Sequence, residues 1–209
     1  MELYFIRHGR QNSRLCNVDV ELSTEGICQA DLLGKRLAYA GIDVIYSSDM
    51  VRAVQTAQIV NLYCRVEHVV YPELREINFG KLEGLSDEVI AKEYREFQLE
   101  QDKMETDLPY PDGECSEDVY RRMIPVIEKI VQTDDKNADI ITHGGVIRSF
   151  VSAILGMGFE KKLLLAKTLE NSSITKINYN KEKNRFYLDS FNDYGHLEQT
   201  PELLRENWL

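Results

Sequence analysis

The chain has 209 residues, a length that fits one domain of ordinary size or one domain with an insertion. Hydrophobic residues make up 43 % and charged residues 29 %, which is typical of a soluble globular protein and excludes disordered and collagen-like chains. With 25 basic and 35 acidic residues, the net charge of −10 argues against broad electrostatic binding to nucleic acid or to an anionic membrane. An anionic ligand would have to meet a local cluster of positive charge.

The cysteines and the N-terminus indicate an intracellular protein without a metal centre. The cysteines are widely scattered and have no neighbouring His at a zinc spacing; they are Cys16, Cys28, Cys64 and Cys115. We therefore expect reduced thiols and no metal or other cofactor. The apolar run 3–6 is too short for a signal sequence, and no run reaches about 18 apolar residues, so we expect a cytoplasmic protein.

The first strand–helix unit begins at the N-terminus. Residues 3–6 read as a short buried strand, and a polar loop leads to Ser23, a plausible helix N-cap. The following helix has apolar residues at intervals of three and four, and Gly41 supplies a left-handed stop.

A second unit repeats this order. Residues 43–46 form a strand, and Asp49 can cap a helix whose apolar residues share one stripe. Arg52 lies in the first turn of that helix on another face. A third strand is expected at 66–70.

A charged helical stretch at about 87–105 follows, closed by the Pro- and Gly-containing loop 109–113. We interpret the segment at about 81–113 as a small helical cap inserted into a single domain that spans 1–209. As a cap it would lie over the site as a lid; a solvated amphipathic helix is an equal alternative.

The last third of the chain continues the alternation of helices and strands. A helix spans about 119–130, where Pro125 should kink it or set its start. A strand at 138–142, a helix at 146–155 and a hairpin of the strands 174–179 and 186–191 follow. The pattern predicts an α/β protein, a three-layer sandwich with a largely parallel central sheet flanked by helices.

The chemistry-bearing residues follow the predicted strands. The first strand ends in Arg7-His8-Gly9, the second leads to Arg52, and a later one ends in His143-Gly144-Gly145. Carboxyl ends of parallel strands meet at one edge, so two histidines and two arginines should converge there. Converging cations need a compensating anion, and glycines beside both histidines would let a ligand approach the backbone, so a phosphate site is the most economical interpretation.

An ordered set of motifs over about residues 1–155 resembles the histidine phosphatase superfamily, in its phosphoglycerate-mutase-like branch. These motifs are Arg7-His8-Gly9, Leu22-Ser23-Thr24-Glu25-Gly26, Ser47-Ser48-Asp49 through Arg52-Ala53, Leu74-Arg75-Glu76, Gly113-Glu114 and Thr142-His143-Gly144-Gly145. Members that act on α-ribazole phosphate or on a broad range of substrates are the most similar.

The resemblance implies a role for each residue. His8 would be the nucleophile, and Arg7, Arg52, a protonated His143 and Gly144 would hold the phosphate. Glu76 would be a protonated general acid that later acts as base, with Glu83 and Glu114 as weaker alternatives.

The chain departs from the family pattern after the first motif. The family often has an Asn six residues after the histidine, where this chain has Arg14. Asn12 could take over that phosphate contact, or Arg14 could become a further cation. We hypothesise that Arg10 and Arg14 favour substrates with extra negative charge; an unchanged KM of Arg14→Ala for such substrates would reject this idea. Near the C-terminus, His196 could edge the pocket, although a surface role is favoured.

The function that the sequence favours is metal-independent hydrolysis of a small phosphorylated metabolite through phosphohistidine at His8, by a histidine acid-type phosphatase. Two alternatives stay open: a phosphoglycerate-type mutase, against which chain length argues, and a non-catalytic module that binds a phosphorylated ligand. No nucleic-acid or membrane partner is expected. A homodimer is left open, because no sequence motif supports it. The sequence identifies neither the physiological substrate nor any lid motion.

Overall fold

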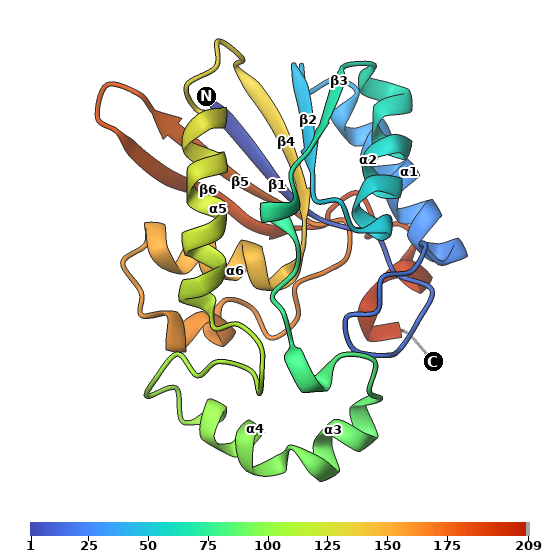
Figure 1. The fold of residues 1–209 in the computed structure, drawn as a ribbon. Coiled ribbons are helices and arrows are strands. Elements are labelled where there is room, and N and C mark those ends of the chain that lie inside the picture. The colour runs from blue at the N-terminus through green and yellow to red at the C-terminus, as the bar shows by residue number, and fades with distance from the viewer. Residues whose placement is uncertain (208–209) are drawn as a thin grey trace.

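The computed structural model describes residues 1–207, and within them six strands form one sheet in the order β3-β2-β4-β1-β5-β6 (Figure 1). The strands are β1 (Glu2–Arg7), β2 (Val44–Ser47), β3 (Glu67–Val70), β4 (Asn137–Thr142), β5 (Ile174–Asn180) and β6 (Arg185–Asp193). Strands β1 to β4 are parallel, whereas β5 is antiparallel to β1 and β6 is antiparallel to β5. The predicted largely parallel sheet and the terminal hairpin are therefore confirmed.

Helices cover both faces of this sheet. They are α1 (Thr24–Leu37), α2 (Val51–Cys64), α3 (Asp87–Glu93), α4 (Arg95–Asp102), α5 (Ser116–Ile130) and α6 (Gly144–Ile154). Short 3₁₀ helices lie at Pro72–Leu74, Gly80–Leu82, Phe159–Leu164, Pro201–Leu203 and Arg205–Asn207. In Figure 1, α1 and α2 lie on one side of the sheet and α5 and α6 on the other, which confirms the three layers.

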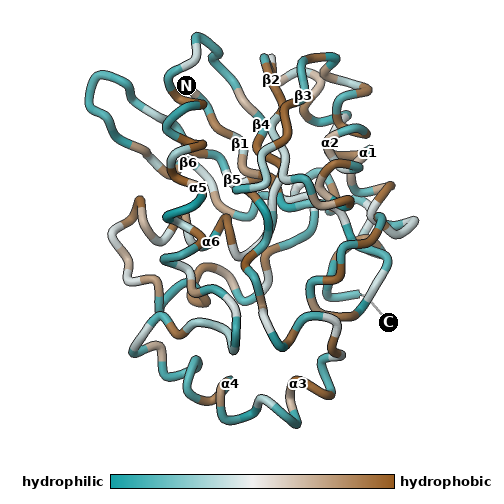
Figure 2. The backbone as a smooth tube through the Cα atoms, viewed as in Figure 1, coloured by the Kyte–Doolittle hydropathy of each residue, from teal (hydrophilic) through white to brown (hydrophobic). Residues whose placement is uncertain are grey.

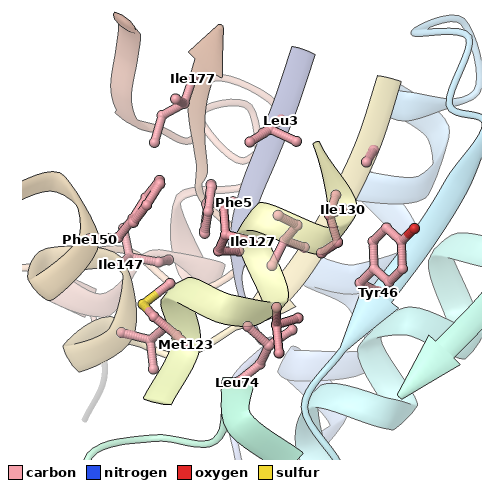
Figure 3. Close-up of a cluster of buried hydrophobic side chains, with 14 of the residues drawn as sticks. Leu3, Phe5, Tyr46, Leu74, Met123, Ile127, Ile130, Ile147, Phe150 and Ile177 are labelled. Atoms are coloured by element: carbon pink, nitrogen blue, oxygen red, sulfur yellow. The ribbon is translucent and has the colours of Figure 1, made fainter. Parts of the chain in front are cut away.

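Two hydrophobic cores result from the alternation of side chains along the strands. In β1, Phe5 belongs to the core under α5 and α6, and its neighbour Ile6 to the core under α1 and α2. Figure 3 shows the first core, where the Phe5 and Phe150 rings stack with centroids 4.8 Å apart. Figure 2 shows hydrophobic colour along the central strands and hydrophilic colour in the loop between β5 and β6. The sheet is thus anchored on both faces, and its strand ends are fixed in space.

Helix ends differ from the predicted ones in two places. Ser23 caps α1 as expected, its Oγ accepting from Gly26 N at 3.2 Å, but α1 ends at Leu37, before the left-handed Gly41. The helix α5 begins at Ser116 and stays helical through Pro125, so this proline does not set its start.

The N-cap predicted for α2 is wrong. Met50 holds that position without a side-chain cap, and the Asp49 carboxylate pairs with Arg75. The first amide of α2, Val51 N, instead donates to Asp19 Oδ1 at 2.8 Å. A side chain from the polar loop after β1 therefore caps this helix.

The charged stretch predicted at 87–105 forms two short helices, α3 and α4, separated at Tyr94. Both lie beyond the carboxyl ends of the parallel strands (Figure 1). Within residues 1–207, no helix is long and apolar enough to span a membrane.

Candidate active site

The two histidines are brought together by the pairing of β1 with β4. Arg7 lies opposite Thr142 in the parallel register, and His8 N donates to Thr142 O at 2.9 Å. The residue that directly follows each of these two strands is a histidine. The rings of His8 and His143 have centroids 5.0 Å apart. The two histidines therefore lie together at one edge of the sheet, as predicted.

His8 presents an unprotonated ring nitrogen to the site. Its Nδ1 lies 2.7 Å from Gly9 O, and since a carbonyl only accepts, Nδ1 carries the proton. Nε2 therefore has a lone pair, and Arg52 Nε donates to it at 3.1 Å. Burial, and then the cations Arg52 and Arg7, hold the pKa of His8 well below its usual value, so the imidazole is neutral.

Arg52 is buried and held on three sides. Besides the contact with His8, its Nη1 donates to Val18 O at 3.0 Å and its Nη2 to Asn17 Oδ1 at 2.7 Å. Burial lowers its pKa, and the nearby Glu76 opposes that shift. The guanidinium is thus fixed beside the ring that it contacts.

His143 is fully buried, and its ring contacts the hydroxyl of Ser48. Its Nε2 lies 2.7 Å from Ser48 Oγ, whereas its Nδ1 has no hydrogen-bond partner within the described residues. Burial, and then Arg52, His8 and Arg7, hold the pKa of His143 well below its usual value. The ring is therefore neutral in the site without a ligand, where cations surround it, and its protonated state beside a bound phosphate stays a prediction. A bound phosphate dianion would oppose that field and raise the pKa of His143.

Arg7 contributes a second guanidinium next to His8. Its Nη1 donates to Leu169 O, and its Nε is buried without a hydrogen-bond partner in the part of the chain that is described. Burial first, and then Arg205, lower the pKa of Arg7 to about 9, while Glu76 opposes the shift. A buried donor of this kind needs an acceptor, which a phosphate oxygen would supply.

Glu76 lies against the start of α6. Its Oε1 accepts from Ile77 N and Gly145 N, each at 2.9 Å. A Cβ on Gly145 would lie 2.5 Å from that oxygen, so glycine is required for this contact. With Oε1 occupied by backbone donors, Oε2 is the oxygen that can carry and transfer a proton.

The weaker candidates Glu83 and Glu114 do not line the pocket around His8. Glu83 Oε1 accepts from Asn17 Nδ2 at 2.8 Å, and Glu114 Oε1 accepts from Arg122 Nε at 2.8 Å. Both line a neighbouring pocket of about 650 Å³ that does not include His8. Glu76 lines both that pocket and the pocket around His8.

The two glycines that directly follow the histidines have different surroundings. A Cβ on Gly9 would lie 2.6 Å from Gly26 O, so Gly9 allows the chain to pack against α1. At Gly144, the nearest atom to such a Cβ is Arg7 Nε at 3.8 Å, an ordinary contact. Packing against α1 thus requires glycine at position 9, whereas Gly144 borders the pocket next to Arg7, and close approach of a ligand there stays a prediction.

The pocket around His8 has a volume of about 820 Å³ and is bounded on one side by the loop after β1. Arg10, Asn12 and Arg14 line it, with Asn12 and Arg14 exposed. Asn12 N donates to Glu21 O at 2.8 Å, which fixes the loop backbone. The phosphate contacts of Asn12 and Arg14 therefore stay predictions.

Two asparagines at the site were missed by sequence reasoning. Asn17 orients Arg52, as described above, and Asn171 Nδ2 donates to the carbonyl of His8 at 2.8 Å. Asn171 belongs to a polar turn before β5, and its sequence neighbours gave no signal for this contact. His196 lies elsewhere, with Nδ1 3.2 Å from Arg36 Nη1, and it is absent from the lining of the His8 pocket.

Comparison with known proteins gives one family match and several relatives. The sequence pattern of the histidine phosphatase superfamily (branch 1) matches residues 3–193. A putative phosphoserine phosphatase from Hydrogenobacter thermophilus is 28 % identical over 87 % of this chain and 91 % of its own. A probable phosphoglycerate mutase from Yersinia pestis is 27 % identical over 95 % of both chains, so length does not separate mutases from phosphatases here.

Solved structures give the same fold. A mycobacterial glucosyl-3-phosphoglycerate phosphatase superimposes with a TM-score of 0.83 at 26 % identity, covering 92 % of this chain and 98 % of that one. A putative α-ribazole-5'-phosphate phosphatase from Escherichia coli superimposes with a TM-score of 0.78 at 22 % identity, covering 93 % and 97 %, which supports the fold alone.

Proposed function

Because the chain belongs to the histidine phosphatase superfamily, we propose that it hydrolyses small phosphorylated metabolites through a phosphohistidine formed on His8. The observation that carries this proposal is the state of the His8 ring. Its Nδ1 proton is held by Gly9 O at 2.7 Å, which leaves the Nε2 lone pair directed at the cationic cluster where a phosphate would bind.

In the first step, His8 Nε2 attacks phosphorus in line with the ester oxygen. The N–P bond forms as the P–O bond to the leaving alcohol breaks, and Glu76 gives that oxygen its proton. Arg7 and Arg52 donate to the equatorial oxygens of the phosphoryl group, and their positive charge stabilises the transition state. His143 supports these oxygens through Nδ1, which has no acceptor in the described structure.

In the second step, water attacks the phosphoryl group and the N–P bond breaks. The Glu76 carboxylate takes a proton from this water, and inorganic phosphate leaves with the neutral His8 restored. Glu76 therefore acts as acid in the first step and as base in the second, and His8 acts as nucleophile in the first step and as leaving group in the second.

We further propose the acid-type subclass, with highest activity at mildly acidic pH. The reaction needs a neutral His8, and the lowered pKa of this ring keeps it neutral as the pH falls below the usual histidine value. It also needs an acid that gives the leaving oxygen its proton, the role assigned above to Glu76.

The test uses p-nitrophenyl phosphate at mildly acidic pH with protein that has been treated with a chelator. We expect hydrolysis by the wild type, an acid-labile phosphoryl group trapped on His8, and loss of both in His8→Ala. His196→Ala serves as the matched control, because His196 lies outside the pocket, and it should keep both. Absence of both hydrolysis and labelling in the wild type would favour a module that only binds phosphorylated ligands.

A mutase would use the same phosphohistidine but return the phosphoryl group to the substrate. The named relative from Yersinia pestis makes this the second candidate. Incubation with 3-phosphoglycerate separates the two, because a phosphatase releases inorganic phosphate and a mutase accumulates the isomeric ester.

A further inference from the structure

A second, smaller pocket adjoins the pocket around His8. Its volume is about 250 Å³, and the residues shared by the two pockets are Arg7, Glu76, Phe79 and Arg205. Whole ligands usually occupy pockets of about 300 to 1,000 Å³, so this space suits one end of a substrate rather than a separate molecule. A substrate whose phosphate lies beside His8 can extend into it.

Positive charge dominates the lining of the smaller pocket. Its charged residues are Arg7, Glu76, Arg148, Lys162, Lys167 and Arg205. Lys162 Nζ lies 3.0 Å from Asp107 Oδ1, so that charge is already compensated. The remaining lining has more positive than negative charge, in a chain whose net charge is −10. Such a local excess favours an anionic ligand.

Arg148 is anchored so that part of its guanidinium stays available. Its Nε donates to Leu165 O at 3.2 Å and its Nη2 to Ala166 O at 3.1 Å. Its Nη1 lies near Gly144, the first residue of α6. A Cβ placed on Gly144 would be 3.9 Å from Arg148 Nη1 and 3.8 Å from Arg7 Nε. Two guanidinium groups thus flank the N-terminus of an 11-residue helix, a position that itself favours an anion.

Arg7 lines both pockets, and its buried Nε, the donor assigned above to the reacting phosphate, has no hydrogen-bond partner within residues 1–207. The neighbouring cations also act on one another. Burial, and then Arg205, lower the pKa of Arg7, and Arg148 acts in the same direction. Burial is likewise the main cause that lowers the pKa of Arg148, with Arg205 adding to it and Glu76 opposing. An anion in this pocket would relieve that repulsion.

We propose that the smaller pocket binds a second anionic group of the substrate, a carboxylate or a second phosphate, through Arg148 and Arg205. This inference rests on the proposed phosphatase function and narrows its substrates to small phosphomonoesters with another anionic group a few bonds from the reacting phosphate. The rings of Phe79 and Tyr110, with centroids 4.6 Å apart, form an apolar wall that suits the short carbon chain between the two anions.

The test compares two pairs of substrates that differ only at the far end. One pair is 3-phosphoglycerate and glycerol 3-phosphate, and the other is the bisphosphate and the monophosphate of propane-1,3-diol. We expect kcat/KM to be higher for the substrate with the second anion by roughly tenfold or more, as charge-assisted hydrogen bonds to guanidinium imply. The pair with the larger preference identifies the second group as carboxylate or phosphate.

Variants locate the origin of this preference. In Arg148→Met and in Arg205→Ala, the ratio of kcat/KM within a pair should fall toward one. Arg121→Ala is the matched control, because Arg121 is an exposed cation of α5 paired with Glu117, and it should keep the ratio. Arg205→Ala keeps the test valid if loss of the Arg148 contacts to Leu165 and Ala166 impairs folding.

Several outcomes would overturn the inference and leave the phosphatase function standing. These are equal kcat/KM within both pairs, a preference that survives in both variants, and a preference lost in Arg14→Ala instead, which would place the second anion at the rim of the larger pocket. If no ester is hydrolysed at all, the proposed function itself fails. Calorimetric binding of the same pairs to His8→Ala protein then decides the subsite: tighter binding of the second anion that depends on Arg148 supports it, and equal binding rejects it.

Discussion

At the scale of single residues, we expect the hydroxyl of Ser48 to determine which nitrogen of His143 carries the proton. Ser48 Oγ lies 2.7 Å from His143 Nε2 and also accepts a long hydrogen bond from Met50 N at 3.4 Å. The hydroxyl has one proton of its own, and the mechanism proposed above requires that Ser48 donates this proton to Nε2. The proton of neutral His143 then sits on Nδ1, the atom that has no partner within residues 1–207.

Ser48→Ala should therefore lower kcat/KM by roughly 10- to 100-fold, because the ring can adopt the tautomer that offers no proton to the phosphate. Ser48→Thr keeps the hydroxyl and should restore most of the activity. Ser152→Ala removes another buried hydroxyl, from α6, and should have little effect. Steady-state kinetics with p-nitrophenyl phosphate test the set, and equal losses in all three variants would contradict this role of Ser48.

Asp139 is a buried carboxyl group of β4 that the proposed mechanism does not use. Neither of its oxygens has a hydrogen-bond partner in the described part of the chain, and burial raises its pKa well above the usual value. Above about pH 4 the unfolded chain ionises this group while the folded protein keeps it protonated. Its contribution to folding stability therefore falls as the pH rises, until the pH reaches the pKa in the folded state.

Asp139→Asn removes this titration without changing the size of the side chain. The gain in unfolding free energy of the variant over the wild type should grow as the pH rises above about 5, by at most about 1.4 kcal/mol for each pH unit, until the pH reaches the raised pKa. Urea denaturation at a series of pH values measures it. Stability curves that stay parallel across this range would show that Asp139 is ionised in the folded protein.

At the scale of elements, the loop between β1 and α1 fixes the start of α2. Asp19 Oδ1 accepts from Val51 N at 2.8 Å, and Asn17 Oδ1 accepts from Arg52 Nη2 at 2.7 Å. These two contacts set the first turn of α2, which carries Arg52 to His8. A loop far from α2 in the sequence thus positions a residue of the proposed phosphate site.

Asp19→Ala should lower the unfolding free energy by about 1 kcal/mol, as the loss of a helix cap does. It should also lower kcat/KM, because Arg52 directly follows the amide that loses its acceptor. Asp19→Asn keeps an oxygen acceptor and should behave like the wild type. Thermal unfolding and kinetics on the same three proteins decide this, and a stable Asp19→Ala protein with unchanged activity would contradict the capping role.

The contrast between Asp19 and Asp49 shows what a sequence can predict here. The strands and helices follow from the spacing of apolar residues, and the order of alternation brings His8 and His143 to one edge of the sheet, as found. The cap of α2 depends on how a distant loop folds back, so the local candidate Asp49 was wrong. Asn171 was missed for the same reason. Its contact with His8 O joins the turn before β5 to the end of β1, which are far apart in the sequence. The charge of His143 depends on burial among cations, which no local pattern encodes.

At the scale of the whole molecule, the fold holds its cations in a site that is unfavourable without an anion. Arg52 and both histidines are buried, and burial lowers the pKa of all three. The two hydrophobic cores on either face of the sheet supply the stability that keeps these groups together. A phosphate ion should therefore stabilise the entire domain, because it binds the folded site and not the unfolded chain.

Inorganic phosphate at about 100 times its dissociation constant should add about 2.7 kcal/mol to the unfolding free energy. For a domain of this size, that corresponds to a rise in Tm of roughly 5 to 10 °C. Arg52→Gln should reduce the rise, because it removes a donor and a charge from the site, whereas Arg121→Gln on the exposed face of α5 should not. Sodium chloride at matched ionic strength separates binding from general screening. An equal rise in Arg52→Gln and in the wild type would mean that phosphate binds elsewhere on the molecule, and that the buried cations do not form its site.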